Sequence, residues 1–167
     1  LGAIAVPMDP RQSAREIDHV VNDAGAVLLL HDVDLADRLP ESGGLGVPLD
    51  ALPMPEGDAS LAFGDSVNGA PPDAVVSHEE DVTAILYTSG STGKPKGAAL
   101  THLNIAHSVI HHSGNLGLDE RDRIAMAVPL SKVTGLVCGV VAALLGGSLL
   151  ILMRRFKAAD FISLAER

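Results

Sequence analysis

The chain has 167 residues, of which 47% are hydrophobic and only 2% aromatic, with no tryptophan. This length and composition suffice for one domain with a sizeable core of Ala, Val, Leu and Ile, and they exclude a disordered chain. The formal net charge of −9 argues against a nucleic-acid-binding surface, so we expect no nucleic-acid partner. The single cysteine, Cys138, excludes an internal disulfide and a cysteine-rich metal site, and it fits a reducing cytoplasm.

The first elements that the sequence predicts are a strand, a helix and a second strand. The apolar run of residues 1–7 predicts a short buried strand. Ser13 and Glu16 have the spacing of a capping box at the start of a helix that should end near Gly25. One face of this helix carries apolar residues that we expect to be buried: Ile17, Val20 and Val21. Residues 26–30 predict the second strand, and the order of these elements indicates an α/β fold with parallel pairing.

The segment of residues 32–78 contains many glycines and prolines, which interrupt any long periodicity. Residues 35–39 predict a short helical turn, and residues 47–49 predict a brief strand. We expect the rest of the segment to form surface connections. The acidic residues 79–81 that follow are interpreted as a solvated run.

A glycine- and hydroxyl-rich loop follows the next apolar run. Residues 82–86 predict a buried strand, and residues 87–97 then read Tyr-Thr-Ser-Gly-Ser-Thr-Gly-Lys-Pro-Lys-Gly. Glycines let a ligand approach the main chain, hydroxyl and N–H groups donate to phosphate oxygens, and lysines add positive charge. The close spacing of Gly90 and Gly93 and the proline at position 95 exclude a Walker A loop. A polar surface turn is the alternative, but the preceding strand and the length of the pattern favour a polyphosphate-binding loop.

This loop resembles the signature loop of the acyl-adenylate-forming (AMP-binding) superfamily, which includes acyl-CoA synthetases, amino-acid adenylation domains of peptide synthetases and luciferases. The resemblance implies that the loop binds the β- and γ-phosphates of ATP through Thr88, Ser89, Gly90, Ser91, Thr92, Gly93, Lys94 and Lys96. It further implies a catalytic role for Thr92 and Lys96, whose donor groups would hold pyrophosphate as it leaves. For Lys94, a merely solvated side chain is the alternative.

A strand at residues 98–100 and a helix capped by Thr101 and extending to about His112 are predicted after the loop. His107 and His111 lie four residues apart on this helix. The pair lacks the glutamate of the metalloprotease pattern H-E-x-x-H, and no third ligand is evident. We therefore interpret these histidines as surface or packing residues and expect no metal site.

The uncharged run of residues 133–153 has the length of a membrane span. Gly146 and Gly147 divide it into a helical piece, residues 135–145, and a strand-like piece, residues 148–153. Each piece is short enough for the core of an α/β domain, so we expect no integral membrane span.

Predicted elements also flank this run. A charged turn at residues 119–123 leads into a strand at residues 124–128, which the proline at position 129 ends. Residues 158–167 predict a final amphipathic helix. The side chains expected to face inward from it are Phe161, Ile162, Leu164 and Ala165.

Residues 129–136, which read Pro-Leu-Ser-Lys-Val-Thr-Gly-Leu, form a second motif. They resemble the family's proline-leucine-x-histidine-x-x-glycine segment, which lines the acyl pocket near the carboxylate. The resemblance implies substrate-binding roles for Lys132, Val133, Thr134 and Gly135. Lys132 occupies the histidine position, a departure that implies an altered acid specificity. An ordinary strand-to-helix turn is the alternative.

The resemblance implies an α/β arrangement of layered sheets with flanking helices, part of the large N-terminal domain of an adenylate-forming enzyme. We expect residues 1–167 to be a partial AMP-binding domain, without a complete second domain, taken from inside a longer cytoplasmic protein. The implied activity is that of an acid–thiol ligase of fatty-acid or aryl-acid metabolism, an acyl-CoA synthetase that uses ATP, Mg²⁺ and coenzyme A.

The family's ribose-binding aspartate, its C-terminal lysine and most Mg²⁺ ligands are expected outside the chain, so residues 1–167 alone should be inactive. Two alternatives stay open for the whole protein. One is an amino-acid adenylation domain of a peptide synthetase, and the other is a nucleotide-binding pseudoenzyme without turnover.

Overall fold

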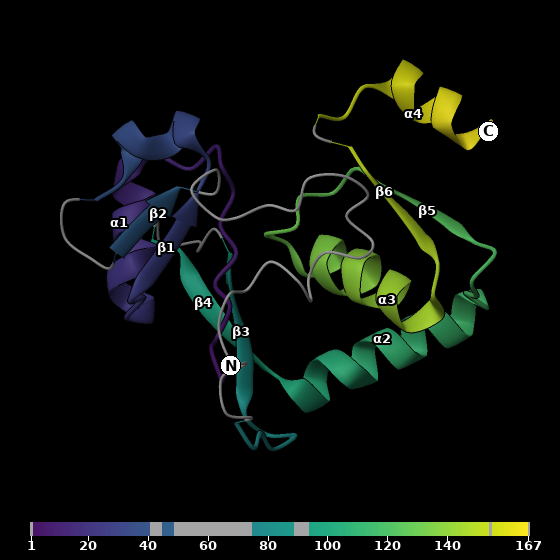
Figure 1. Ribbon diagram of the computed structural model, residues 1–167, viewed down its shortest axis with the longest axis horizontal. Helices are drawn as coiled ribbons and strands as arrows, with labels where there is room; N and C mark the ends of the chain where they lie inside the picture. The colour runs from purple at the N-terminus through teal and green to yellow at the C-terminus, as the bar shows by residue number, and fades with distance from the viewer. Residues whose placement is uncertain (1, 41–44, 49–74, 89–93, 154, 167) are drawn as a thin grey trace, which may run out of the picture. The chain divides into compact units, whose positions relative to one another are not determined.

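The computed structural model describes residues 2–40, 45–48, 75–88, 94–153 and 155–166. The chain divides into two compact units, each made of helices and strands (Figure 1). Leu1–Ala3 and Pro10–Ser77 belong to the first unit, and Ile4–Asp9 and His78–Arg167 belong to the second. This mixture of elements agrees with the predicted α/β class.

Helix α1 (Ala14–Ala24) of the first unit has the predicted caps. The backbone N–H of Ser13 donates to the Glu16 carboxylate at 2.8 Å, and the Ser13 Oγ accepts from the Glu16 N–H at 3.4 Å, which completes the capping box. The helix ends at Gly25, whose φ of 62° is readily adopted only by glycine. The apolar residues predicted to be buried are buried: Ile17, Val20 and Val21.

Strand β1 (Leu28–His31) pairs in parallel with β2 (Leu45–Pro48), and a short 3₁₀ helix, η1 (Val33–Arg38), lies between them. The strand begins two residues later than predicted, and the helical turn lies where residues 35–39 suggested. The unit therefore contains a parallel pair of strands, but the predicted pairing of this strand with the N-terminal run is wrong, because the partner of β1 is β2. The remainder of the predicted connection, residues 49–74, lies outside the described residues.

The second unit contains an antiparallel hairpin, in which β3 (Val82–Thr88) pairs with β4 (Lys96–Thr101). Three side chains of β3 are buried, as predicted for this run: Ala84, Leu86 and Tyr87. Helix α2 (His102–Leu116) follows β4 directly (Figure 1). Thr101 and Asn104 form its capping box, and Gly117, with a φ of 65°, ends it. The helix is thus one turn longer than predicted.

The buried strand predicted for residues 1–7 is wrong. Among its described residues, 2–7, strand pairing is confined to Ala5, which bridges Ala84 of β3, and Ile4 is 49% exposed. The Ala5 N–H donates to the carbonyl of Thr83 at 3.0 Å, and its carbonyl accepts from the N–H of Ile85 at 2.9 Å. Residues 1–3 of this run belong to the first compact unit and the rest belongs to the second. The apolar run therefore does not form a single strand of one sheet.

Strands β5 (Arg123–Met126) and β6 (Leu149–Leu152) pair in parallel, and one continuous helical stretch lies between them in the sequence. Its first part, η3 (Thr134–Val141), is π-helical, and its second part is α3 (Ala142–Gly146). Gly147, with a φ of 69°, ends it. The predicted division of the uncharged run is confirmed, and no helix in the described ranges is long and apolar enough to cross a membrane.

The core of the second unit lies where α2 packs against the η3–α3 helix (Figure 1). A hydrophobic cluster at this place has the buried members Val109, Val137 and Ala142, with the partly buried Ile105, Leu118 and Val141 packed against them. Aromatic side chains contribute nothing to this cluster, in agreement with a core of small aliphatic residues.

Helix α4 (Ala158–Ala165) confirms only part of the predicted inward face. Phe161 and Leu164 are half-buried, whereas Ile162 is 58% exposed and Ala165 is exposed. Within the described part of the chain, the helix contacts mainly β5. Periodicity identifies an apolar face, but the width of the face that is covered depends on what packs against it.

Candidate functional site

The β3–β4 hairpin carries the predicted phosphate loop. In its register Thr88 is the partner of Lys96, and Tyr87 is the partner of Gly97. Residues 89–93, which contribute five of the predicted phosphate ligands, lie outside the described residues. The two strand positions that bracket the loop are therefore held opposite each other by the antiparallel ladder.

Close packing at Gly97 fixes this register. A Cβ atom at position 97 would lie 2.7 Å from the Cγ2 of Ile85 and 2.9 Å from the Cζ of Tyr87, so any larger residue would force these two side chains to shift. Because successive residues of a strand point to opposite faces, Thr88 and Lys96 share the other face of the hairpin. Both of their side chains are exposed, as is that of Lys94. One hydroxyl and one ammonium group are thus presented together at the end of the hairpin.

The predicted acid-binding segment is a tight turn between β5 and the η3 helix. The Lys132 N–H donates to the Pro129 carbonyl at 3.0 Å, and the Lys132 carbonyl accepts from the Leu136 N–H at 2.9 Å. A Cβ atom at Gly135 would lie 2.3 Å from the Pro129 oxygen and 2.9 Å from that of Val128. The helix therefore approaches the preceding backbone so closely that this position requires glycine.

The side chains of this turn differ sharply in exposure. Lys132, Val133 and Thr134 are exposed, whereas Gly135 is buried. Ser131 is only 8% exposed, and its Oγ has no hydrogen-bond partner among the described residues. The sequence reasoning missed Ser131, because a small hydroxyl residue in a turn carries no signal of its own burial. It also missed the π-helical backbone that begins at Thr134, a form found frequently at functional sites.

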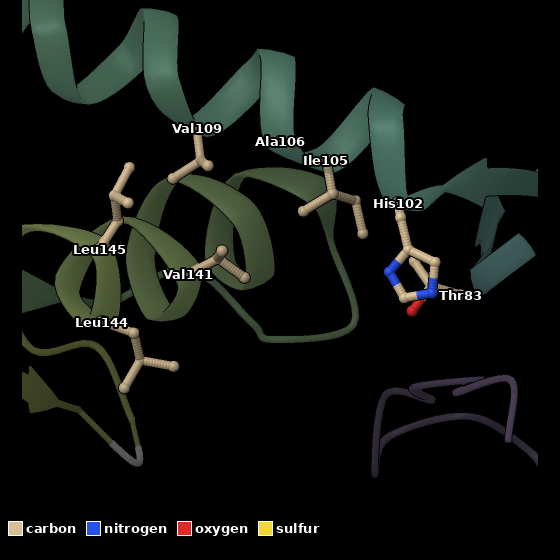
Figure 2. A pocket seen from close by; sticks show the side chains of 8 residues that line it. All are labelled: Thr83, His102, Ile105, Ala106, Val109, Val141, Leu144 and Leu145. Atoms are coloured by element: carbon tan, nitrogen blue, oxygen red, sulfur yellow. The ribbon is translucent and has the colours of Figure 1, made fainter. Parts of the chain in front are cut away.

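The second unit also has an apolar groove of about 490 Å³ on the helical layer, shown in Figure 2. Ile105, Val109 and Val141 line it together with Leu144 and Leu145 of α3. Its other lining residues are Ala106 and, at one end in the view, Thr83 and His102. The groove contains none of the residues that the sequence predicted for phosphate or acid binding.

The histidines of α2 form a pair and no larger cluster in the described ranges. The ring centroids of His107 and His111 lie 6.2 Å apart in an edge-on arrangement, and both residues are exposed. Across the part of the chain that the structure describes, no group of three or more His, Cys, Asp or Glu side chains is placed to hold a metal ion.

Comparison with known proteins decides the family. The sequence profile of the family described as "AMP-binding enzyme" matches residues 1–167. The chain belongs to the AMP-binding enzyme family. It is 34% identical over 170 residues to a feruloyl-CoA synthase of Amycolatopsis sp., covering 99% of this chain and 32% of that protein. It is 32% identical over 185 residues to 4-coumarate–CoA ligase 1 of Oryza sativa subsp. japonica, covering 100% of this chain and 32% of the relative.

A solved structure has the same fold. The O-succinylbenzoate coenzyme A synthetase from Bacillus subtilis, in complex with ATP and a magnesium ion, matches with a TM-score of 0.79 and 26% identity. The match covers 100% of this chain and 33% of that protein. The predicted resemblance and the predicted fold of the N-terminal domain of adenylate-forming enzymes are confirmed. The chain spans about a third of the length of the AMP-binding enzymes that it matches.

Proposed function

We propose that the whole protein activates a carboxylic acid with ATP, forming an acyl-adenylate, and then transfers the acyl group to coenzyme A. The observation that carries this proposal is the family match over the full chain, which includes both motifs. The similarity to relatives named as CoA synthases and CoA ligases supports the transfer to coenzyme A. Since the match runs through both compact units without a break, we further propose that residues 1–167 contribute to one adenylation domain.

In this proposal, the hairpin loop grips the β- and γ-phosphates of ATP through Thr88, Ser89, Gly90, Ser91, Thr92, Gly93, Lys94 and Lys96. The exposed Thr88 and Lys96 side chains fit this role, because one donor and one cation share a face at the end of the hairpin. When the carboxylate oxygen attacks the α-phosphorus, the bond to the bridging oxygen breaks and negative charge accumulates on pyrophosphate. Donors already held in place stabilise that charge without reorganisation.

The ladder of β3 and β4 supplies this preorganisation, because it fixes the Cα atoms of Thr88 and Lys96 before ATP binds. Mg²⁺ would neutralise the phosphate charge when bound. We assign no Mg²⁺ ligand to the described residues, whose His, Cys, Asp and Glu side chains form no group of three or more suited to a metal.

The acid binds, in this proposal, at the turn that contains Lys132, Val133, Thr134 and Gly135. Support comes from the exposed side chains on a backbone whose position is fixed by Gly135. The names of the relatives refer to aryl acids, ferulate and coumarate, and a fatty or aryl acid is the class we propose. We also propose a cytoplasmic location, which a chain with one cysteine supports.

The test is a product assay with the purified whole protein, ATP, Mg²⁺ and coenzyme A. A panel of fatty acids, aryl acids and amino acids should give AMP and an acyl-CoA thioester, detected by mass spectrometry, with some fatty or aryl acid. Adenylate formation with amino acids alone would instead support a peptide-synthetase adenylation domain. Nucleotide binding without AMP formation from any acid would support a pseudoenzyme and contradict the proposal.

A further inference from the structure

Lys132 has no ion-pair partner among the described residues. Between Ile124 and Met153 it is the only charged residue of the sequence. Its side chain is exposed, and in the described part of the chain no carboxylate pairs with it. The apolar residues near it in the sequence are partly exposed as well: Val128 by 39%, Leu130 by 37% and Val133 by 49%. This turn therefore presents one cation within an otherwise apolar segment.

Lys132 also lies next to the N-terminal end of a helix. Lys132 directly precedes the helical stretch that begins at Val133. The N-terminal end of a helix carries partial positive charge, which stabilises anions and destabilises cations. Both backbone groups of Lys132 are hydrogen-bonded, to Pro129 and Leu136, so the Cα atom cannot move away from the helix end without breaking these bonds. An anion that contacts Lys132 would be attracted by the ammonium group and by the helix end together.

We propose that the acid activated by this protein carries a second carboxylate, and that Lys132 recognises that second carboxylate. The inference rests on the proposed function, because it takes residues 129–135 as part of the acid-binding site. Lys132 would act as a specificity-determining residue. The partly exposed apolar side chains of the turn would contact the hydrocarbon body of the same dicarboxylic acid.

The chemistry of adenylation explains why the partner is the second carboxylate and not the reacting one. The reacting carboxylate forms a bond from its oxygen to the α-phosphorus, the bond from that phosphorus to the pyrophosphate oxygen breaks, and pyrophosphate leaves with the electron pair. The acyl group of the product has lost the carboxylate charge. A cation bound to the reacting carboxylate would stabilise the ground state more than the transition state and would slow the reaction. A second carboxylate keeps its charge throughout, so its pairing with Lys132 improves binding without this penalty.

The experiment is acid-dependent exchange of pyrophosphate into ATP by the whole protein. Alkane and arene dicarboxylic acids are each compared with their own monomethyl esters, which keep the body of the acid and remove one charge. For the preferred skeleton, we expect kcat/KM for the diacid to exceed that for its monoester by about tenfold to a hundredfold, mainly through KM. Lys132→Gln should abolish the preference, and Lys132→Arg should retain part of it. Lys157→Gln, at an exposed lysine outside the turn, is the matched control and should keep the wild-type ratio.

The outcomes separate the inference from the proposed function. Exchange with monocarboxylic acids but without a diacid preference, or a preference that survives in Lys132→Gln, overturns the inference and leaves acid activation in place. No exchange with any acid overturns the proposed function, and this inference with it. A second measurement does not depend on any variant: the KM for the diacid should rise with ionic strength more steeply than that for its monoester. Equal salt dependence would contradict the ion pair.

Discussion

The packing of Gly135 gives the sharpest structural prediction for the acid-binding turn. A Cβ atom there would lie 2.3 Å from the Pro129 oxygen and 2.8 Å from its carbonyl carbon, whereas ordinary contact begins at 3.4 Å. Both atoms belong to the main chain, so relief of the clash requires a backbone shift rather than a rotamer change. Overpacking of this kind costs about 1–3 kcal/mol, and the backbone location places Gly135→Ala at about 3 kcal/mol.

Two other helical glycines provide matched controls for the same substitution. At Gly114 of α2, no atom lies within 4 Å of an added Cβ. Gly114→Ala should therefore be neutral or stabilising by roughly 0.5 kcal/mol, since alanine loses less backbone entropy in a helix. At Gly139 of η3, the nearest atom is the terminal methyl of Met126 at 2.6 Å, which belongs to a flexible side chain that can move aside. Gly139→Ala should fall between the other two variants.

The assay is urea denaturation of the whole protein, followed by circular dichroism, with the denaturation midpoints of the three variants compared at a common slope. The predicted order of stability is Gly114→Ala, then Gly139→Ala, then Gly135→Ala. If Gly135→Ala were as stable as Gly114→Ala, the close approach of helix and turn would be wrong. The argument that this close approach fixes the backbone of the acid-binding segment would then fail as well.

Two further predictions concern the cap of α1 and the histidine replacement at Lys132. Hydrogen bonds from the backbone N–H and the hydroxyl of Ser13 hold the pKa of Glu16 below its ordinary value of 4.5. A carboxylate with a lowered pKa stabilises the folded state above its unfolded pKa, and this stabilisation is lost as pH falls through the folded pKa. Glu16→Gln should therefore flatten the dependence of unfolding free energy on pH below about 4.5; an unchanged curve would refute the cap as its source. Lys132→His should weaken use of the native acid and improve pyrophosphate exchange with plain fatty or aryl acids, whereas unchanged kinetics with every acid would contradict the pocket assignment.

The sequence predicted those elements of the fold that are determined by interactions between residues close together in the sequence. The capping box of Ser13 and Glu16 satisfies helix N–H groups from three residues away, so its spacing alone identifies the helix start. Gly25 and Gly147 adopt positive φ values at helix ends, and their positions end the helices as expected. Local signals of this kind also divided the long uncharged run into a helix and a strand.

The parts that could not be predicted depend on partners far away in the sequence. Residues 1–7 are apolar, yet among the described residues of this run only Ala5 pairs with a strand. No local pattern specifies that the run is divided between two units. Ile162 lies on the apolar side of α4 but is exposed, because hydrophobicity does not state what covers a helix. The hydroxyl of Ser131 is buried and has no hydrogen-bond partner among the residues that the structure describes, and this burial comes from packing that its neighbours in sequence do not reveal.

For the candidate site, too, the sequence predicted the local elements but did not by itself identify the ligand. The apolar run of residues 82–86 and the glycine-rich turn after it indicated the strands on either side of the loop, and the structure adds that Thr88 lies opposite Lys96. The resemblance to a known family supplied the ligand, since glycines and hydroxyls alone fit a polar turn equally well. Whether residues 89–93 grip phosphate stays a prediction, because they lie outside the described residues.

Separate measurement of the two half-reactions tests the central claim, that the hairpin loop stabilises the departing pyrophosphate. The whole protein is compared with Lys96→Ala and Thr92→Val, and Lys157→Ala serves as a control outside the hairpin. The adenylation half-reaction, followed by pyrophosphate exchange, should slow by about a hundredfold, on the order of 3 kcal/mol for one lost preorganised donor. Formation of the thioester from supplied acyl-adenylate and coenzyme A should continue at the wild-type rate. Equal losses in both half-reactions would show that the loop supports the fold and not the phosphate chemistry.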